Sequence, residues 1–155
     1  MKKILTIFWL LVVCLFINGQ TIYRGASTYR SDAVCNVRNG YVYDGSSSYR
    51  SDIILTFDGK HIYKGASTYT SDILGTWSNN RLYLGKTPHM TSTVATYRNN
   101  IIYKGASTVS TDAAYRYDGK YLYKGNSSYR SDIILTTSRY VNPGLLMYII
   151  TIYSL

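Results

Sequence analysis

Five aspartates recur at intervals of 20 or 40 residues and are the first candidates for chemistry in this chain. Each follows a Ser or a Thr; they are Asp32, Asp52, Asp72, Asp112 and Asp132. A ring of carboxylates at short range would suit a hard cation such as Ca²⁺. Each Asp, however, stands where a polar segment meets an apolar run, and hydrogen bonds to nearby backbone account for Asp at such a junction. We therefore predict a structural role for this series and no metal site.

Catalytic chemistry has few candidates. The chain has two histidines, His61 and His89, and no Glu. A catalytic site needs one constellation of partners, and such a constellation normally breaks the symmetry of a repeat. Neither histidine has a Ser, Cys or carboxylate partner that stands out from the repeated pattern, so we predict that the protein is not an enzyme and uses no cofactor. A hydrolase remains an alternative only if His61 or His89 meets an Asp in a cleft.

Basic residues beside tyrosines are the candidates for binding. One set follows the Tyr of a Tyr-x-Gly step and a second set follows another Tyr in a polar segment; together they are Lys64, Lys104, Lys124, Arg30, Arg50 and Arg130. Alternation along a strand places each cation of the first set on the opposite face from its neighbouring Tyr. A ring of cations would attract anionic lipid headgroups or acidic glycans. The competing interpretation is that these charges keep a tyrosine-rich surface soluble.

A 20-residue repeat, present six times without insertion or deletion, positions these candidates. Every copy contains a Tyr followed two residues later by a Gly: Tyr23, Tyr43, Tyr63, Tyr83, Tyr103 and Tyr123, with Gly25, Gly45, Gly65, Gly85, Gly105 and Gly125. Tyr stacks well against neighbouring strands, and Gly allows the chain to turn. We interpret both series as structural residues of the repeat.

Each copy is predicted to form a β-hairpin. In the third copy the β-branched and aromatic run 53–57 is followed by Asp58-Gly59 and by the return run 60–64. Asp-Gly is typical of a two-residue hairpin turn, which would place Ile62 opposite Leu55. Two aliphatic series are expected to form the core. One is Ile22, Val42, Ile62, Leu82, Ile102 and Leu122; the other is Val34, Ile54, Leu74, Val94, Ala114 and Ile134.

The fold class that follows is all-β. The chain has 18 Tyr against three Phe and two Trp, and its Tyr, Thr, Gly and Asn content favours short strands and turns. Because a lone hairpin cannot bury a face, the six 20-residue β-hairpin repeats must pack on one another. We predict closure around an axis, as a flower or shallow barrel. The alternative is an open β-hairpin solenoid, which would need end caps that the first copy lacks.

Apolar segments flank the repeats. Residues 1–19 begin with the basic Lys2 and Lys3, which an apolar run follows. We predict that they are a signal peptide; the alternative is an uncleaved anchor. Removing it would lower the formal net charge from +9 to +7 and leave one cysteine, Cys35, so no intrachain disulfide can form. Residues 20–141 are the repeat domain. Residues 142–155 are an apolar tail, expected to be a plug, an extra strand or a cap, or to contact a membrane.

The repeated pattern resembles a known family. Ile-Tyr-Lys-Gly, followed by Ser-Asp-Ile-Ile-Leu-Thr and Asp-Gly-Lys, is similar to the short bacterial repeats of β-flower proteins over about residues 21–140. The resemblance implies hairpin petals around a shallow symmetric barrel, and the best-known members have four or five copies. It implies no established activity. The likeness of that barrel to tubby-type lipid-binding domains implies a lipid ligand.

Together these observations predict a non-catalytic exported repeat domain, structural or binding, in the periplasm, at the cell surface or secreted. Its expected target is lipid or another anionic or amphipathic ligand. The alternative is a cell-envelope glycan-binding module, which needs exposed aromatic rings at Tyr29, Tyr49, Tyr69 and Tyr129. Export argues against nucleic acid as a partner. Specific function is expected where the repeat is broken, in the fourth copy with Pro88, His89 and Ser92 and in the tail.

Overall fold

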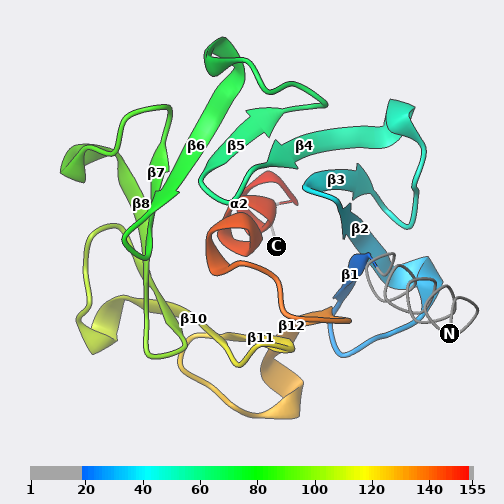
Figure 1. Cartoon of the computed structure of the whole chain (residues 1–155). Helices are drawn as coiled ribbons and strands as arrows, with labels where there is room; N and C mark the ends of the chain where they lie inside the picture. Colours follow the sequence, from blue (N-terminus) through cyan, green and yellow to red (C-terminus); the bar gives the residue numbers. More distant parts are fainter. Residues whose placement is uncertain (1–18, 154–155) are drawn as a thin grey trace, which may run out of the picture.

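A computed structural model describes residues 19–153 of the chain. Twelve antiparallel strands close into a single barrel around a central helix, α2 (Figure 1). The strands are β1 Gln20–Arg24, β2 Ala33–Arg38, β3 Tyr41–Asp44, β4 Ile53–Phe57, β5 His61–Lys64, β6 Ile73–Ser78, β7 Arg81–Leu84, β8 Thr93–Arg98, β9 Ile101–Lys104, β10 Ala113–Tyr117, β11 Tyr121–Lys124 and β12 Ile133–Thr137. The predicted closed all-β fold is confirmed, and the open solenoid is excluded. The predicted signal peptide lies outside the described residues, apart from Gly19.

The two ends of the chain meet to close the barrel. β1 pairs with β2 on one side and with β12 on the other, and Ile22 lies opposite both Cys35 and Thr137. Five hairpins are continuous in sequence, whereas the sixth consists of β12 and β1 from opposite ends of the repeat region. Every strand therefore has two hydrogen-bonded neighbours, and the barrel leaves no strand edge open to another chain.

The register of the third-copy hairpin differs from the predicted one. Leu55 pairs with Lys64, and Ile62 lies opposite Phe57, so the expected pairing of Ile62 with Leu55 is wrong by two residues. The turn is Gly59-Lys60, and Gly59 has a φ of 97°. Asp58 precedes the turn and accepts the Lys60 and His61 backbone N–H groups at 2.8 and 2.6 Å. Asp58 thus caps a turn that lies one residue later than expected.

Only one of the two predicted core series is fully buried. The series that begins at Ile22 is at most 2% exposed in all six copies, which confirms that prediction. In the other series Val34 is buried, but Val94 is 37% exposed and the remaining members are half-buried. The prediction assumed regular alternation, but this position is a β-bulge: Ile62 pairs with Gly75 and Tyr63 with Ile73, which leaves Leu74 as an extra residue. Such a bulge redirects the side chain, and the same shift recurs in every copy.

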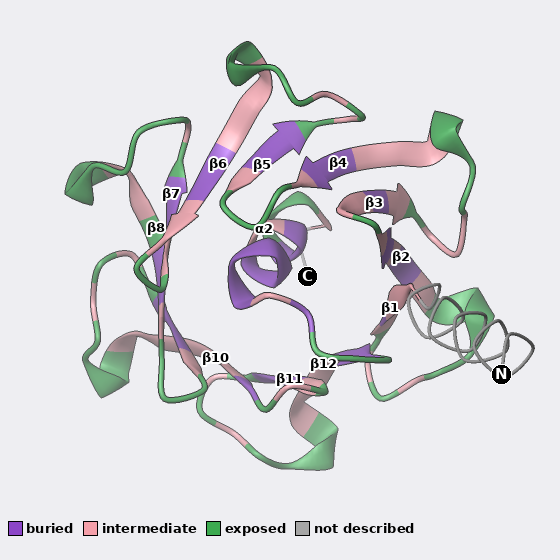
Figure 2. Cartoon of the chain, in the orientation of Figure 1, coloured by how far each residue is buried: buried purple, intermediate pink, exposed green. Residues whose placement is uncertain are grey.

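The apolar tail forms helix α2, Pro143–Tyr153, inside the barrel. Its apolar residues Leu145, Leu146, Met147, Ile149 and Ile150 are buried (Figure 2). A helix that is apolar on all sides needs a buried environment, and the lumen provides one. Of the three forms expected for the tail, the extra strand is not what residues 143–153 adopt. The helix start is fixed by Asn142, whose Oδ1 accepts the Gly144 N–H at 2.8 Å.

The barrel has two different ends. The turn end carries the two-residue turns within hairpins. The loop end carries the last residue of each return strand and six connecting loops, which contain the 3₁₀ turns η1 Arg30–Asp32, η2 Arg50–Asp52, η3 Thr70–Asp72, η4 Met90–Ser92, η5 Ser110–Asp112 and η6 Arg130–Asp132. The C-terminal part of α2 lies at the loop end, because the Tyr153 hydroxyl donates to Asp44, the last residue of β3, at 2.8 Å.

Candidate functional site

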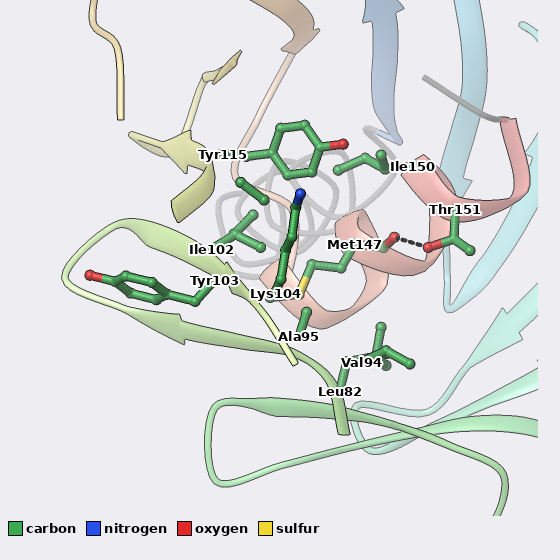
Figure 3. A pocket seen from close by; sticks show the side chains of 11 residues that line it. Leu82, Val94, Ala95, Ile102, Tyr103, Lys104, Tyr115, Met147, Ile150 and Thr151 are labelled. Atoms are coloured by element: carbon green, nitrogen blue, oxygen red, sulfur yellow. Dashed lines mark hydrogen bonds between the residues drawn. The ribbon is translucent and has the colours of Figure 1, made fainter. Parts of the chain in front are cut away.

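An apolar pocket lies between α2 and the wall of the barrel. Its volume is about 310 Å³, and strands β7 to β10 form its outer wall (Figure 3). Met147, Ile150 and Thr151 of α2 form the inner wall. Exposed Val94 and Lys104 place the mouth of the pocket at the loop end.

Small side chains on strands β8 and β10 create this pocket. Ala95 occupies the position that Leu55 and Leu135 fill in other copies. Ala114 likewise occupies the position of Leu74 and its aliphatic equivalents. Both alanines line the pocket. Two adjacent hairpins thus each carry a small side chain beside α2, and the helix side chains that face them leave the space unfilled.

On another side of α2 the same kind of space is closed. Gly75 occupies the position of Ala95 in the preceding repeat, and a Cβ built there would lie 3.5 Å from the Tyr148 ring. A Cβ on Gly144 of the helix would lie 2.4 Å from two carbons of the Trp77 ring. Both glycines allow an aromatic ring to pack directly against backbone. The contrast with Ala95 shows that α2 fits the barrel closely toward β6 and loosely toward β8–β10.

One cation stands at the pocket. Lys104 ends β9, and Figure 3 shows its side chain between Met147 and Tyr115. Across the pocket, Thr151 donates its hydroxyl to the Met147 carbonyl at 3.0 Å. Within residues 19–153 the one ion pair is that between Asp58 and His61, so no described carboxylate pairs with Lys104.

The other predicted binding cations are spread around the loop end. Lys64 and Lys124 end β5 and β11 at positions equivalent to Lys104, and both are exposed, but neither lines the pocket. The arginines begin the loop 3₁₀ turns and are also exposed; they are Arg30, Arg50 and Arg130. Arg30 Nε donates to the Ser46 hydroxyl at 3.1 Å. The predicted set is therefore a ring in which Lys104 alone reaches the apolar pocket.

Arg130 lines a second, smaller cavity on the outside of the ring. Its volume is about 180 Å³, and Tyr121, Tyr123 and Ser128 contribute to its lining. The two tyrosine rings meet edge to face with centroids 6.1 Å apart. This cavity is polar where the first is apolar.

Exposed apolar and aromatic side chains gather at the loop end. Ten large side chains of this kind are more than a third exposed among the described residues, and nine of them belong to the loop end. The nine are Tyr29, Tyr49, Tyr69, Leu84, Met90, Val94, Val109, Tyr129 and Ile152; the tenth, Tyr140, packs against Tyr117 near the turn end. The four loop tyrosines are 75 to 76% exposed. The loops that carry them lie at the outer corners of the ring (Figure 2).

The repeated Tyr and Gly have structural surroundings. Tyr63, Tyr83, Tyr103 and Tyr123 are buried to within 8% exposure, and the Tyr63 hydroxyl donates to Asp58 at 2.7 Å. Gly65 has a φ of 56°, a conformation that favours glycine. Its N–H donates to the carbonyl of the bulged residue Ile54 at 2.9 Å. The glycine therefore ends the return strand and closes the bulge of the same hairpin.

The repeated aspartates are bound within their own loops. In five copies a loop serine donates its hydroxyl to the Asp carboxylate, as Ser47 does to Asp52. The hydrogen bonds from Ser47 and Ser51 lower the pKa of Asp52. The Asp carboxylates thus accept hydrogen bonds from serine hydroxyls, whereas hydrogen bonds with nearby backbone were expected. Within residues 19–153 no group of three His, Cys, Asp or Glu side chains has the arrangement of a metal site.

His61 does meet a carboxylate, at the turn of the third copy. Its Nδ1 lies 3.3 Å from Asp58 Oδ2. Burial raises the pKa of Asp58. Hydrogen bonds from the His61 backbone, the Tyr63 hydroxyl and the Lys60 backbone outweigh burial and lower this pKa to about 2. The sixth-copy equivalent, Asp118, makes the same backbone and Tyr contacts with Tyr121 in place of the histidine. The cluster is therefore a turn motif that does not depend on the imidazole.

Two features of the interior were missed from the sequence. Buried threonines donate to the carbonyl of the repeated glycine, as Thr56 does to Gly65 at 2.7 Å, and Thr76, Thr96 and Thr136 repeat the contact. Thr recurs at this position in four copies, and this recurrence was the sequence signal that could have predicted the contact. Tyr117 is fully buried, and its hydroxyl accepts the Val141 N–H at 2.9 Å. That contact guides the chain into the lumen and had no sequence signature.

Comparison with known proteins gives one match. A family described as 6-fold beta flower protein matches residues 11–87 and, overlapping with them, residues 62–142. No curated protein and no solved structure matches the chain. The matched stretches together extend over most of the chain and over all twelve strands.

Proposed function

The chain belongs to the 6-fold beta flower protein family, and we propose that it is a non-catalytic, exported binding domain whose loop end adsorbs to anionic lipid surfaces. The observation that carries the proposal is the segregation of exposed apolar and aromatic side chains to the loop end. Exposed apolar and aromatic side chains that share one end of a protein can mark an interaction site. Tyr suits a membrane interface because its ring is apolar and its hydroxyl can remain in water.

Charge supports an anionic surface as the target. Arg24, Lys64, Lys104 and Lys124 are exposed at the last position of their strands, on the same end as the loop tyrosines. Each cation near an anionic membrane contributes about 1 kcal/mol of attraction. The repeated Asp carboxylates share this end, but loop serines hydrogen-bond to them. The aromatic side chains therefore determine that the loop end faces the membrane, and the excess of basic residues favours anionic lipids over neutral ones.

Adsorption at the interface needs no spanning segment. No helix within residues 19–153 is both long enough and apolar enough to cross a bilayer. Most apolar side chains of α2 are buried in the barrel lumen. The tail thus contributes to binding through the few residues at its C-terminal end, such as exposed Ile152.

Co-sedimentation with lipid vesicles tests the proposal. We expect the chain to pellet with phosphatidylglycerol-containing vesicles at low salt, and much less with pure phosphatidylcholine. Replacing Tyr29, Tyr49 and Tyr129 together by Ser should abolish pelleting. Tyr140→Ser is the matched control, because Tyr140 is exposed but lies near the turn end. Absence of pelleting at low salt, or equal losses in both variants, would remove the lipid function.

A cell-envelope glycan-binding module is the second candidate. The high exposure of Tyr29, Tyr49, Tyr69 and Tyr129 meets the requirement that this alternative set. The second cavity adds a polar aromatic corner with Arg130. A pull-down with insoluble cell-wall polysaccharide separates the two functions, because a glycan module should bind the polysaccharide with vesicles absent and lose it in Arg130→Ala.

A further inference from the structure

We propose that the pocket between α2 and strands β8–β10 binds the acyl chain of a single-chain amphipathic anion, whose head group Lys104 holds at the mouth. This site is distinct from the loop-end surface, and either can function without the other. Four observations support it: the volume of the pocket, the chemistry of its wall, the single cation at its mouth and the repeat positions that create it.

The volume fits a medium-length chain. Ligand pockets in proteins begin at about 300 Å³, and this pocket has about 310 Å³. An engineered cavity of about 150 Å³ holds a benzene molecule. Twice that volume accommodates a chain of roughly ten carbons, so we expect selectivity for chains of this length over much longer ones.

The wall suits a hydrocarbon. Val94, Ala95 and Ile102 face the pocket from the barrel, and Met147 and Ile150 face it from the helix. Met is unbranched and adapts to ligands of different shape. The polar side chains of the lining are those of Tyr103, Lys104, Tyr115 and Thr151, and the Thr151 hydroxyl already donates to the Met147 carbonyl.

The cation decides the charge of the occupant. Lys104 has no described carboxylate partner, and its aliphatic stem lines the apolar wall while the ammonium group can remain at the mouth. A neutral hydrocarbon would gain nothing from this group, whereas a carboxylate or phosphate would form a charge-assisted hydrogen bond. The complementarity therefore selects an anionic head on an apolar tail.

The pocket is a departure from the repeat. Leu, Ile or Val occupies the position of Ala114 in all five other copies, and Leu occupies that of Ala95 in two. Toward β6, where the wall is also reduced, Tyr148 packs against Gly75. The space beside Ala95 and Ala114 receives no such side chain. A barrel selected for stability alone would fill it, because each buried methylene contributes about 0.8 kcal/mol.

Titration calorimetry with decanoate and with decyl phosphate tests the site. We expect saturable one-to-one binding of at least one of them, and the stronger ligand identifies the head group as carboxylate or phosphate. Lys104→Gln should weaken binding on the order of tenfold. The matched control is Lys124→Gln, which removes a cation from the equivalent position outside the pocket and should change affinity less than twofold.

Ala114→Leu fills the pocket with the residue that Leu74 supplies at the equivalent position. It should weaken decanoate binding at least tenfold while pelleting with anionic vesicles is retained. No saturable binding of either probe, unchanged affinity in Ala114→Leu, or equal losses in the two lysine variants would overturn the proposal. If neither probe binds but the chain still pellets with anionic vesicles, the pocket proposal fails and the loop-end function is retained.

A second measurement serves if Ala114→Leu does not fold. Methyl resonances of the wild-type chain report directly on the pocket, and decanoate should shift those of Met147 and Ile150. The methyl resonances of Ile22, a buried residue of β1 that does not line the pocket, should not move. Uniform shifts, or none, would overturn the proposal.

Discussion

Helix α2 meets two differently built parts of the same repeated wall. Toward β6, Trp77 and Tyr148 pack against glycine backbone, with Gly144 and Gly75 supplying the room. Toward β8–β10, Ala95 and Ala114 leave an apolar pocket of about 310 Å³. The hairpins are nearly the same on both sides, so the strand framework does not depend on what fills the lumen. Side chains at a few positions of the repeat set the fit of the helix, and the position of Ala95 varies from Gly75 to Tyr115 among the copies.

The largest effect is expected from Gly144→Ala on the closely packed side. Helix propensity by itself would make this change stabilising, by up to about 1 kcal/mol. A Cβ within 2.4 Å of the Trp77 ring requires the ring or the helix to move, and overpacking of this kind costs about 1–3 kcal/mol. We expect a net loss of about 1–2 kcal/mol, measured by urea unfolding. A gain in stability would show that Trp77 does not contact Gly144.

The opposite sign is expected from Ala114→Leu on the loosely packed side. Added methyl groups enter existing space there, and cavity filling commonly adds about 0.5–2 kcal/mol. We expect a higher Tm in thermal unfolding followed by circular dichroism. Ala106→Leu is the control, since Ala106 belongs to the same region of the chain but is exposed. A destabilised Ala114→Leu would mean that the two sides of α2 do not differ in packing.

The smallest effect concerns the end of the helix. Burial, then the hydrogen bond to Asp44, raises the pKa of Tyr153 above its ordinary value. A raised folded-state pKa stabilises the fold at pH values below about 10, and that stability is lost as pH rises above it. Tyr153→Phe should therefore reduce the loss of stability above pH 10, and should cost about 0.5–1 kcal/mol at pH 7.

Urea unfolding of Tyr153→Phe across pH 7–11 checks this effect. The double variant with Asp44→Ala provides the control, because two residues in direct contact give non-additive losses. Additive losses would show that the Tyr153 hydroxyl and Asp44 do not interact in solution.

Local sequence determined much of this protein. Six copies of the Tyr-x-Gly step at intervals of 20 residues predicted the hairpins. Turn residues and alternating apolar residues specify a hairpin through contacts between residues close in sequence. The Ile22 series gave the core for the same reason. Closure was predicted because an open stack of hairpins would expose apolar ends, and the pairing of β1 with β12 achieves it.

The tertiary structure decided what the repeat could not. Whether Ile54 and its equivalents face the core depends on a bulge between neighbouring strands, and the helical form of the tail depends on a lumen that exists only after twelve strands have closed. The pocket depends on both, because Ala95 and Ala114 become a binding wall only where α2 passes them. Periodic sequence specifies local structure, whereas the contents of the lumen follow from contacts between residues far apart in the sequence, such as Trp77 with Gly144 and Gly75 with Tyr148.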